Sequence, residues 1–391
     1  MTALFAASLL LSAGCAPDGG PAGGGSDGSA SPRSSPASSA SAAPSPSPSE
    51  DVAEPPPAKG SVKVVSTLAE GLNSPWGLAE LPGGDLLVTS RDQGTITRID
   101  GTTGKKTLLG SVPGVSASGE GGLLGLAVSP TYGTDHLLYV YFTTASDNRI
   151  ARLLYDEDET AGRMLGAPDT IVRDIPKGAV HNGGRIAFGP DRMLYAGTGE
   201  TGDDGLAQDK ESLAGKILRM TPDGEPVHGN PSADSLVYSY GHRNVQGLAW
   251  DGRKQLWASE FGQDTWDELN RIVPDGDYGW PEVEGTKGRK GFIDPVAQWK
   301  TSEASPSGIA FAGGSIWMAG LRGERLWRIP LSGDAAGEPL AAPQSFLEGK
   351  YGRLRTVLAA GGDKLWLVTS ETDGRGTPKP GDDRILVLEV R

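Results

Sequence analysis

Apolar and polar positions along residues 60–391 follow one repeating pattern. Each copy has a short apolar segment, a polar turn that contains Gly or Asp, and a second segment rich in Leu, Trp, Tyr and Val, which is typical of two β-strands joined by a turn. The first segments of the six copies lie at 76–79, 125–128, 185–188, 247–250, 308–311 and 356–358. A third strand-like segment follows, at 94–100, 149–155, 215–220, 268–273, 325–330 and 384–390. Helical periodicity is not evident.

The spacing of the copies indicates the fold. They begin roughly 48 to 62 residues apart, which matches one four-stranded propeller blade with its loops. We therefore predict an all-β fold, a six-bladed β-propeller of four-stranded antiparallel blades, with five or seven blades as the alternatives. An early strand at 62–68 is expected to pair into the last blade and close the ring, because this covers an edge that would otherwise be exposed. The turns before the inner strands would then surround one end of a central channel.

The N-terminal segment has the features of an export signal. Residues 4–12 are apolar but too short to span a bilayer, which is typical of a signal-peptide core. The sequence Ser-Ala-Gly-Cys that follows resembles a bacterial lipobox, although Ser12 stands where Leu is usual and no Lys or Arg precedes the apolar run. We expect residues 1–15 to be a signal peptide and Cys15 to carry a lipid that anchors the protein at the extracellular face of the membrane. A plain signal peptide, and a secreted protein, is the alternative.

Composition divides the rest of the chain into two parts. Residues 16–59 are mostly Gly, Ser, Ala and Pro and cannot bury enough apolar surface to fold, which predicts a disordered tether. Residues 60–391 then form the propeller domain. The single cysteine excludes an intrachain disulfide and zinc sites built from cysteines. The formal net charge of −13 argues against nucleic acid as a partner.

A histidine stands directly before one of the inner strands. His181 is one of four histidines in the chain and opens the sequence His-Asn-Gly-Gly-Arg, which ends at Arg185. A histidine in this setting is more often a hydrogen-bonded structural residue than a catalytic base. Its interpretation therefore depends on the other motifs, of which Gly-His-Arg-Asn at 241–244 has the same place before the next inner strand.

Six motifs occur in one order along the chain. They are Glu-Gly-Gly-Leu-Leu-Gly at 120–125, His-Asn-Gly-Gly-Arg at 181–185, Gly-His-Arg-Asn-Val-Gln-Gly-Leu at 241–248, Asp-Glu-Leu-Asn at 267–270, Asp-Tyr-Gly-Trp-Pro at 277–281 and Arg-Leu-Arg at 353–355. Each motif alone is weak, but the ordered set resembles the soluble sugar dehydrogenases that depend on pyrroloquinoline quinone (PQQ), namely glucose dehydrogenase and aldose sugar dehydrogenase. The fold of that family is a six-bladed propeller. The resemblance extends from residue 62 to the C-terminus.

The resemblance implies an oxidoreductase that acts on small sugars. It would oxidise the anomeric hydroxyl of aldoses to lactones, pass a hydride to PQQ and then pass electrons to an external acceptor. In this family His181 would be the base that removes the hydroxyl proton, a task that suits a neutral imidazole. Arg243 would polarise the quinone carbonyl that accepts the hydride. Val180 stands where some glucose dehydrogenases have an acidic residue beside this histidine.

The resemblance also implies the residues that bind the cofactor. PQQ carries three carboxylates, and arginine makes planar, bidentate contacts with carboxylates. The matching positions are Arg243, Asn244, Arg322, Arg353 and Arg355. Arg322 replaces a Lys of some members, and the alternative for Arg353 and Arg355 is that they are two strand residues that face solvent. Glu120 stands where glucose dehydrogenases often have Gln in contact with cofactor or substrate, and it is expected to contact the cofactor or to pair with Arg243 or Arg185.

Calcium is the second cofactor that the resemblance implies. The family holds one Ca²⁺ between PQQ and two consecutive backbone carbonyls, which here fall on Gly262 and Gln263, and this ion acts as a Lewis acid. A second, structural Ca²⁺ is expected near Asp267, Glu268 and Tyr278. For the two carboxylates, a solvated turn is the alternative.

Two other functions fit a propeller. A metal-dependent lactonase or other hydrolase would need Glu, Asn and Asp side chains around a central cation and no set of converging arginines. A non-catalytic propeller that binds glycan or protein at the cell surface would not need His181. If the chain is a sugar dehydrogenase, we expect its sugar preference to depend on the long loops within 147–176 and 223–236.

Overall fold

The computed structural model describes residues 55–333 and 338–391. The predicted signal peptide, the lipidation site and residues 16–54 of the predicted tether lie outside the described residues. Residues 55–59, the end of that tether, lie against the propeller, where the carbonyl oxygen of Pro57 accepts a hydrogen bond from Arg328 Nη2 at 2.8 Å. Within the described part of the chain, no helix is long and apolar enough to cross a membrane.

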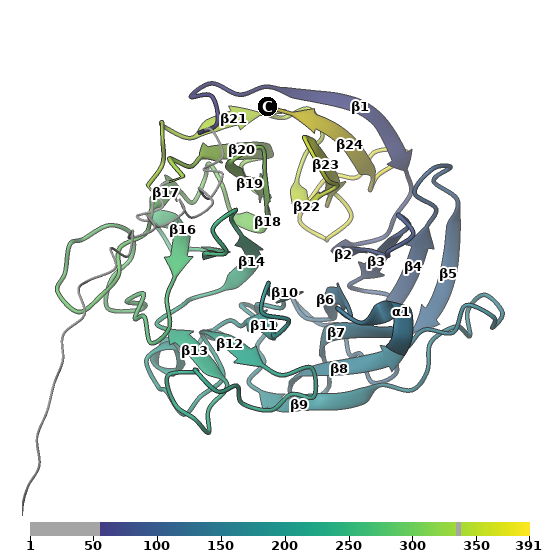
Figure 1. The fold of residues 1–391 in the computed structure, drawn as a ribbon, viewed down its shortest axis with the longest axis horizontal. Helices are drawn as coiled ribbons and strands as arrows, with labels where there is room; N and C mark the ends of the chain where they lie inside the picture. The colour runs from purple at the N-terminus through teal and green to yellow at the C-terminus, as the bar shows by residue number, and fades with distance from the viewer. Residues whose placement is uncertain (1–54, 334–337) are drawn as a thin grey trace, which may run out of the picture. The chain divides into compact units, whose positions relative to one another are not determined.

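Six four-stranded antiparallel sheets stand around a common axis (Figure 1). Blade 1 contains β2 (Pro75–Glu80), β3 (Leu86–Ser90), β4 (Thr95–Ile99) and β5 (Lys106–Ser111). Blade 2 contains β6 (Leu123–Val128), β7 (Leu137–Thr143), β8 (Asn148–Leu154) and β9 (Asp169–Ile175). Blade 3 contains β10 (Ile186–Phe188), β11 (Leu194–Gly197), β12 (Lys216–Met220) and β13 (Val237–Tyr240). The prediction of an all-β, six-bladed propeller is confirmed.

The remaining three blades follow the same order from the axis outward. Blade 4 contains β14 (Val245–Trp250), β15 (Leu256–Glu260), β16 (Trp266–Ile272) and β17 (Ala297–Lys300). Blade 5 contains β18 (Pro306–Ala312), β19 (Ser315–Gly320), β20 (Arg325–Pro330) and β21 (Gln344–Phe346). Blade 6 contains β22 (Leu354–Ala359), β23 (Lys364–Thr369), β24 (Ile385–Val390) and, as its outermost strand, β1 (Val62–Ala69). Among the described residues, two single-turn helices, α1 (Tyr132–Asp135) and η1 (Asp204–Ala207), lie in loops.

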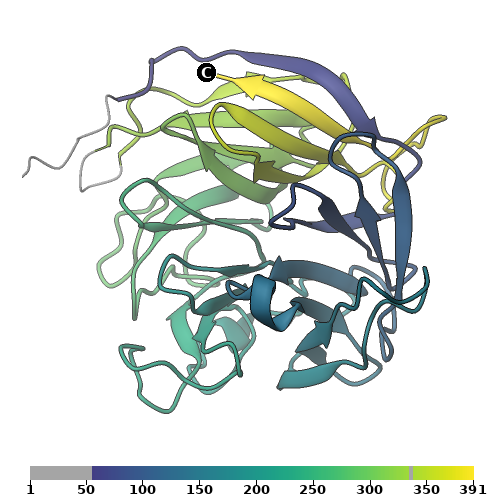
Figure 2. The ribbon, with the colours of Figure 1, turned by 45° about the vertical axis from the view of Figure 1, so that its right-hand side comes forward.

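The first strand closes the ring as predicted. β1 pairs antiparallel with β24, from Val62 opposite Val390 to Ala69 opposite Ile385. Figures 1 and 2 show this N-terminal strand along the outer edge of the C-terminal blade. The pairing covers the edge of β24 and joins the two ends of the described propeller in one sheet, so no blade has to be completed by another chain.

Glycines in the inner strands let the blades approach one another at the axis. A Cβ on Gly125 of β6 would collide with the carbonyl oxygen of Gly184, and a Cβ on Gly247 of β14 would collide with that of Ser307. Both neighbours belong to the next blade, so the Gly of the repeated Gly-Leu-Ala sequence is needed for packing between blades. Farther from the axis, apolar side chains of adjacent sheets form the core, as Tyr139 and Leu194 do between blades 2 and 3.

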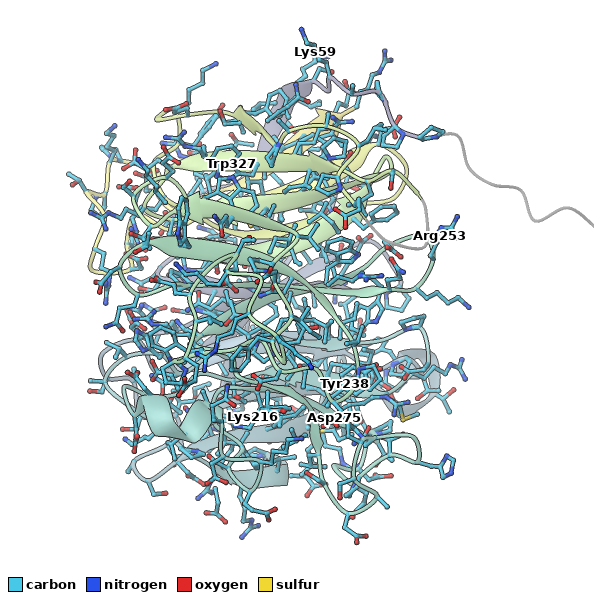
Figure 3. All side chains as sticks on the ribbon, turned by 90° about the vertical axis from the view of Figure 1, so that its left-hand side faces the viewer. Lys59, Lys216, Tyr238, Arg253, Asp275 and Trp327 are labelled. Carbon is cyan, nitrogen blue, oxygen red and sulfur yellow. The ribbon has the colours of Figure 1, made fainter. Side chains whose placement is uncertain are left out.

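A buried lysine holds the loop between β11 and β12. Lys216, which is labelled in Figure 3, is fully buried. Its ammonium donates hydrogen bonds to the carbonyl oxygens of Leu206 at 2.7 Å, Ala207 at 3.0 Å and Ala214 at 2.6 Å. Three acceptors satisfy all three donors of the ammonium, which fixes a long loop that has little secondary structure.

We expect Lys216→Met to lower the free energy of unfolding by about 2 kcal/mol, because carbonyl groups left without a donor in the interior lose hydrogen-bonding energy. Denaturant unfolding of the two proteins measures the difference. Lys254→Met, at an exposed lysine, is the matched control and should change stability by less than about 0.5 kcal/mol. Equal stability of Lys216→Met and wild type would contradict the role of the ammonium.

Candidate active site

A cavity of about 580 Å³ lies at one end of the propeller. It brings together all seven residues that the sequence analysis proposed as catalytic or cofactor-binding, namely Glu120, His181, Arg243, Asn244, Arg322, Arg353 and Arg355. The topology explains the convergence. Because neighbouring strands are antiparallel, every first strand of a blade starts, and every second strand ends, at the same end of the propeller. Each of the seven residues lies at or close to one of these strand ends.

The antiparallel strand order also places the long loops of blades 2 and 3 away from the cavity. The loop 221–236 joins the third and fourth strands of blade 3, and the loop 155–168 does so in blade 2. Such connections lie at the opposite end of the propeller from the cavity. Nearly half of 147–176 is not loop, since it belongs to β8 and β9. The position of these loops speaks against the expectation that they determine sugar preference, which stays a prediction.

His181 is held by carboxylates on two sides. Its backbone has a φ of 53°, an uncommon conformation for a residue with a side chain, and its N–H donates to Glu120 Oε2 at 2.9 Å. Its ring Nδ1 lies 2.7 Å from Oε1 of Glu200, a fully buried carboxylate that also accepts a hydrogen bond from the N–H of Gly202. A carboxylate acceptor places the ring proton on Nδ1, so Nε2 keeps its lone pair. The ring can therefore act as a base toward the cavity.

Glycine makes the turn after His181 possible. A Cβ on Gly183 would lie 2.5 Å from Cα of Thr198, and Gly183 itself has a φ of 62°. Its N–H donates to Asn244 Oδ1 at 3.0 Å, which ties the histidine turn to the turn of the next blade. Asn244 is buried at this junction, so its amide positions both the base and its neighbour Arg243.

Arg243 has spare hydrogen-bonding capacity in a buried position. Its backbone N–H donates to Glu260 Oε2 at 2.8 Å, and its Nη1 lies 3.5 Å from the carbonyl oxygen of Phe261. Its Nε has no hydrogen-bond partner within the described residues and lies 4.0 Å from Glu200 Oε1. The guanidinium also lies 5.4 Å from the ring centre of Trp280. A buried guanidinium with free donors next to a cavity fits an anionic ligand.

Arg353 and Arg355 share one buried carboxylate. Asp373 Oδ2 accepts hydrogen bonds from Arg353 Nη2 at 3.0 Å and from Arg355 Nη2 at 3.0 Å. The side chains are only 12% and 6% exposed, so the alternative that both arginines face solvent is wrong. Burial opposes the charge of Asp373, but Arg355 and Arg353 together hold its pKa below the usual range. Burial lowers the pKa of Arg355 to about 10, so Arg355 still carries its charge at neutral pH.

Glu120 pairs with a different arginine from those expected. Its Oε1 lies 2.7 Å from Arg375 Nη2, while its Oε2 accepts the N–H of His181. The prediction that it pairs with Arg243 or Arg185 is wrong, because the loop between β23 and β24 carries Arg375 over the cavity rim. Arg322 lines the cavity on another side, is exposed, and makes no hydrogen bond or ion pair within the described residues.

Several lining residues lie outside the site motifs, among them Trp76, Arg91, Asp373 and Arg375, while Gln246 lies within the motif at 241–248 but had no role assigned to it. With them the lining contains six arginines (Arg91, Arg243, Arg322, Arg353, Arg355 and Arg375) and two carboxylates (Glu120 and Asp373). The cavity is thus strongly cationic, although the chain as a whole has a formal charge of −13. An interior of this kind favours a ligand with several negative charges.

Three glutamates that hold the turns of the site were not singled out from the sequence, although they share one repeat position. Glu200, Glu260 and Glu371 stand at or just after the end of the second strand in their blades. Glu260 accepts the backbone N–H of Arg243 at 2.8 Å, and Glu371 accepts that of Arg353 at 2.7 Å. Glu200 binds the ring of His181 instead. A glutamate at this repeat position therefore holds the first turn of its own blade.

The carbonyl groups predicted to hold the catalytic calcium ion lie in a turn that directly follows Phe261 of the cavity lining. Glu284 Oε1 accepts four consecutive N–H groups, from Gln263 to Trp266, at 2.7 to 3.2 Å. The carbonyl oxygens of Gly262 and Gln263 accept no hydrogen bond within the described residues, and they follow Phe261, which lines the cavity. Free carbonyl oxygens are hard donors, so they fit Ca²⁺.

The residues predicted to hold a structural calcium ion are buried and have protein partners. Asp267 accepts the N–H groups of Gly262 at 3.0 Å and Ser305 at 2.6 Å. Tyr278 donates its hydroxyl to the carbonyl oxygen of Arg271 at 2.6 Å. Burial, with a contribution from Glu260, raises the pKa of Glu268 above its usual range. Within the described residues, no group of three or more His, Cys, Asp or Glu side chains is arranged to hold a metal ion, so this second calcium site stays a prediction.

The chain is similar in sequence and in structure to known sugar dehydrogenases. Residues 72–379 match the family model described as Glucose / Sorbosone dehydrogenase. The chain is similar to the structure of the PQQ-bound form of aldose sugar dehydrogenase from Streptomyces coelicolor, with 73% identity, a TM-score of 0.85, and coverage of 86% of this chain and 100% of that chain. Quinoprotein glucose dehydrogenase B of Acinetobacter calcoaceticus is 29% identical over 285 residues, which are 63% of this chain and 59% of that protein. Aldose sugar dehydrogenase YliI of Escherichia coli (strain K12) is 28% identical over 341 residues, which are 79% of this chain and 91% of that protein.

Proposed function

Because the chain belongs to the glucose/sorbosone dehydrogenase family, within the PQQ-dependent sugar dehydrogenases, we propose that it oxidises the anomeric hydroxyl of aldose sugars to lactones. PQQ is its cofactor together with Ca²⁺, and an external acceptor takes the electrons. The N-terminal segment 1–15 supports export and a lipid anchor at Cys15, which would place the reaction outside the cell.

The cationic cavity is the observation that carries this proposal. Six arginines line it, and two carboxylates balance only part of their charge. PQQ is a planar quinone with three carboxylates, which matches that excess of positive charge. Arg243, Arg353 and Arg355 would bind the carboxylates or the quinone oxygens, and Arg322 and Asn244 would complete the site. The free carbonyl oxygens of Gly262 and Gln263 would hold Ca²⁺ at its edge.

When bound, PQQ would supply the hydride acceptor and Ca²⁺ would supply a Lewis acid. The protein supplies the proton acceptor. Nε2 of His181 takes the proton of the anomeric hydroxyl as the C–H bond breaks, because Nδ1 is committed to Glu200. The carboxylate of Glu200 then stabilises the imidazolium that forms. Asn244 and Glu120, which bind the backbone around His181, keep the ring at a fixed position in the cavity.

Reconstitution of the full chain tests the proposal. Apo-protein is mixed with PQQ and Ca²⁺, and reduction of an artificial dye is followed with a panel of aldoses. Dye reduction that requires sugar, PQQ and Ca²⁺ is expected. If PQQ binds but no aldose supports reduction, the assigned substrate class is wrong. If PQQ does not bind at all, the proposed function fails and a propeller that binds a glycan or protein takes its place.

We expect Glu200→Gln to lower kcat about 100-fold with little change in KM for sugar, because an amide cannot stabilise the imidazolium as a carboxylate does. Steady-state kinetics of reconstituted protein give both constants, and PQQ titration checks that the cofactor still binds. Glu225→Gln, in the exposed loop at the opposite end of the propeller, is the matched control. A kcat equal to that of wild type would show that Glu200 has no part in proton transfer.

A further inference from the structure

One position of the repeat in the inner strands is glycine in four blades and a larger residue in the other two. Blades 1, 2, 4 and 5 have Gly77, Gly125, Gly247 and Gly308 there. In blades 3 and 6 it is Arg185 and Thr356. The glycines leave room at the axis, since a Cβ on Gly125 or Gly247 would collide with the neighbouring blade. The two larger residues contact each other across that space, with Arg185 Nη2 donating to Thr356 Oγ1 at 3.1 Å.

The side chain of Arg185 connects four blades at the axis. Its Nε donates to the carbonyl oxygen of Gln246 in blade 4 at 2.8 Å. Its guanidinium lies 4.3 Å from the ring centre of Trp76 in blade 1. Thr356 of blade 6 in turn donates to the carbonyl oxygen of Trp76 at 2.6 Å. These contacts explain why an arginine can be accommodated, but none of them neutralises its charge.

The charge of Arg185 is unbalanced within the part of the chain that the structure describes. Arg185 is only 8% exposed, and its guanidinium has no carboxylate partner within the described residues. Another cation, Arg355, lies 5.9 Å from the same Trp76 ring. Burial, with repulsion from Arg355, lowers the pKa of Arg185 to about 9, so it remains charged at neutral pH. A buried cation beside another cation costs free energy unless an anion is near.

The cavity is where such an anion would bind. Trp76, Gln246 and Arg355 all line the cavity, and Arg185 contacts the first two of them from behind while its own side chain is not part of the lining. A ligand with several carboxylates in the cavity would therefore lie just in front of this guanidinium. In a low-dielectric interior, an attraction over that short range is screened only weakly.

We propose that Arg185 is an electrostatic determinant of cofactor affinity that acts through the cavity wall, because the negative charges of the bound cofactor balance a buried cation that the protein leaves unpaired. This inference rests on the proposed function. It implies that cofactor binding stabilises the propeller partly by relieving the charge at the axis, and it gives a reason for an arginine where four blades have glycine.

The test separates charge from packing with three variants of the full chain. Arg185→Gln removes the charge but keeps a hydrogen-bonding side chain, Arg185→Lys keeps the charge but loses the planar fork, and Thr356→Val removes one contact of Arg185 without changing charge. The Kd for PQQ is measured by titration of apo-protein in the presence of Ca²⁺, and thermal unfolding is followed with and without PQQ.

We expect Arg185→Gln to weaken PQQ binding by about ten-fold or more and to reduce the rise in Tm that PQQ causes. Arg185→Lys and Thr356→Val should keep Kd within about three-fold of wild type. If Arg185→Gln binds PQQ as tightly as wild type, or if Arg185→Lys loses affinity ten-fold, the side chain acts by packing alone and the inference is wrong. If the glutamine variant does not fold, a ten-fold loss of affinity in Arg185→Lys still overturns the inference. Failure of wild type to bind PQQ would instead overturn the proposed function.

Discussion

Replacing His181 with alanine is expected to lower kcat for aldose oxidation about 1,000-fold while PQQ still binds, because general-base catalysis contributes roughly 10²- to 10⁴-fold in enzymes. In the proposed mechanism the ring is the base, and the 2.7 Å contact between Nδ1 and Glu200 holds the ring proton on Nδ1. The backbone of His181 is held separately, by Glu120 and Thr201, so removal of the ring should leave the turn in place. Dye-reduction kinetics of reconstituted protein measure the effect.

Two controls make the result specific. His181→Gln keeps a polar side chain of similar size but cannot take up the proton, so it should be as inactive as the alanine variant. His228→Ala removes an exposed histidine from the loop at the opposite end of the propeller and should retain wild-type kcat. Substantial activity in His181→Gln would mean that the histidine only positions the sugar. Loss of PQQ affinity in the alanine variant would assign it to the cofactor site instead.

The sequence was sufficient to predict the fold because the repeat is regular. Each copy carries two strand-like segments and a turn at similar spacing, and only a ring of blades gives every copy the same surroundings. The closing strand was also predictable, since residues 62–68 precede the first repeat and need a partner. The repeated glycine was visible in the sequence as well, but the reason for it became clear only when Gly125 was seen against the backbone of the next blade.

The candidate site was predictable where motif residues precede the inner strands. His181, Arg243 and Arg353 lie in such turns, and the topology of the propeller then brings them to one end. Other residues that orient them come from the ends of second strands or from the loops that follow, where no motif was recognised. Glu200 and Asp373 are examples, and their roles depend on distances across a blade or between loops. A pattern along the chain does not contain those distances.

Charge partners were the hardest feature to predict. Glu120 pairs with Arg375, which is separated from it by 255 positions in the sequence. Spacing along the chain gives no reason to prefer this arginine over Arg243 or Arg185. The loop between β23 and β24 decides the pairing, because its path over the cavity is set by packing in blade 6 rather than by any local sequence signal.

Asp373→Asn is expected to lower the free energy of unfolding of the apo-protein by about 4 kcal/mol, because it leaves buried arginines without their counter-charge. Asp373 is 5% exposed, and its Oδ2 accepts hydrogen bonds from Arg353 and Arg355 at 3.0 Å each. Denaturant unfolding of apo-protein at neutral pH measures the loss. Asp223→Asn, which removes an exposed partner of Arg152, should cost less than about 1 kcal/mol.

The pH dependence of this loss identifies its cause. The arginines hold the pKa of Asp373 below its usual range, so its contribution to stability is present above the unfolded-state pKa of about 3.9 and is lost as pH falls through the lower folded-state pKa. The difference between wild type and Asp373→Asn should therefore be constant from pH 6 to 8 and should shrink only in stronger acid, below about pH 4. With saturating PQQ, whose carboxylates would share the same arginines, the difference should also be smaller than in the apo-protein. If the difference in the free energy of unfolding changes neither with pH nor with PQQ, Asp373 stabilises its loop through hydrogen bonds alone. The two arginines would then not depend on a counter-charge.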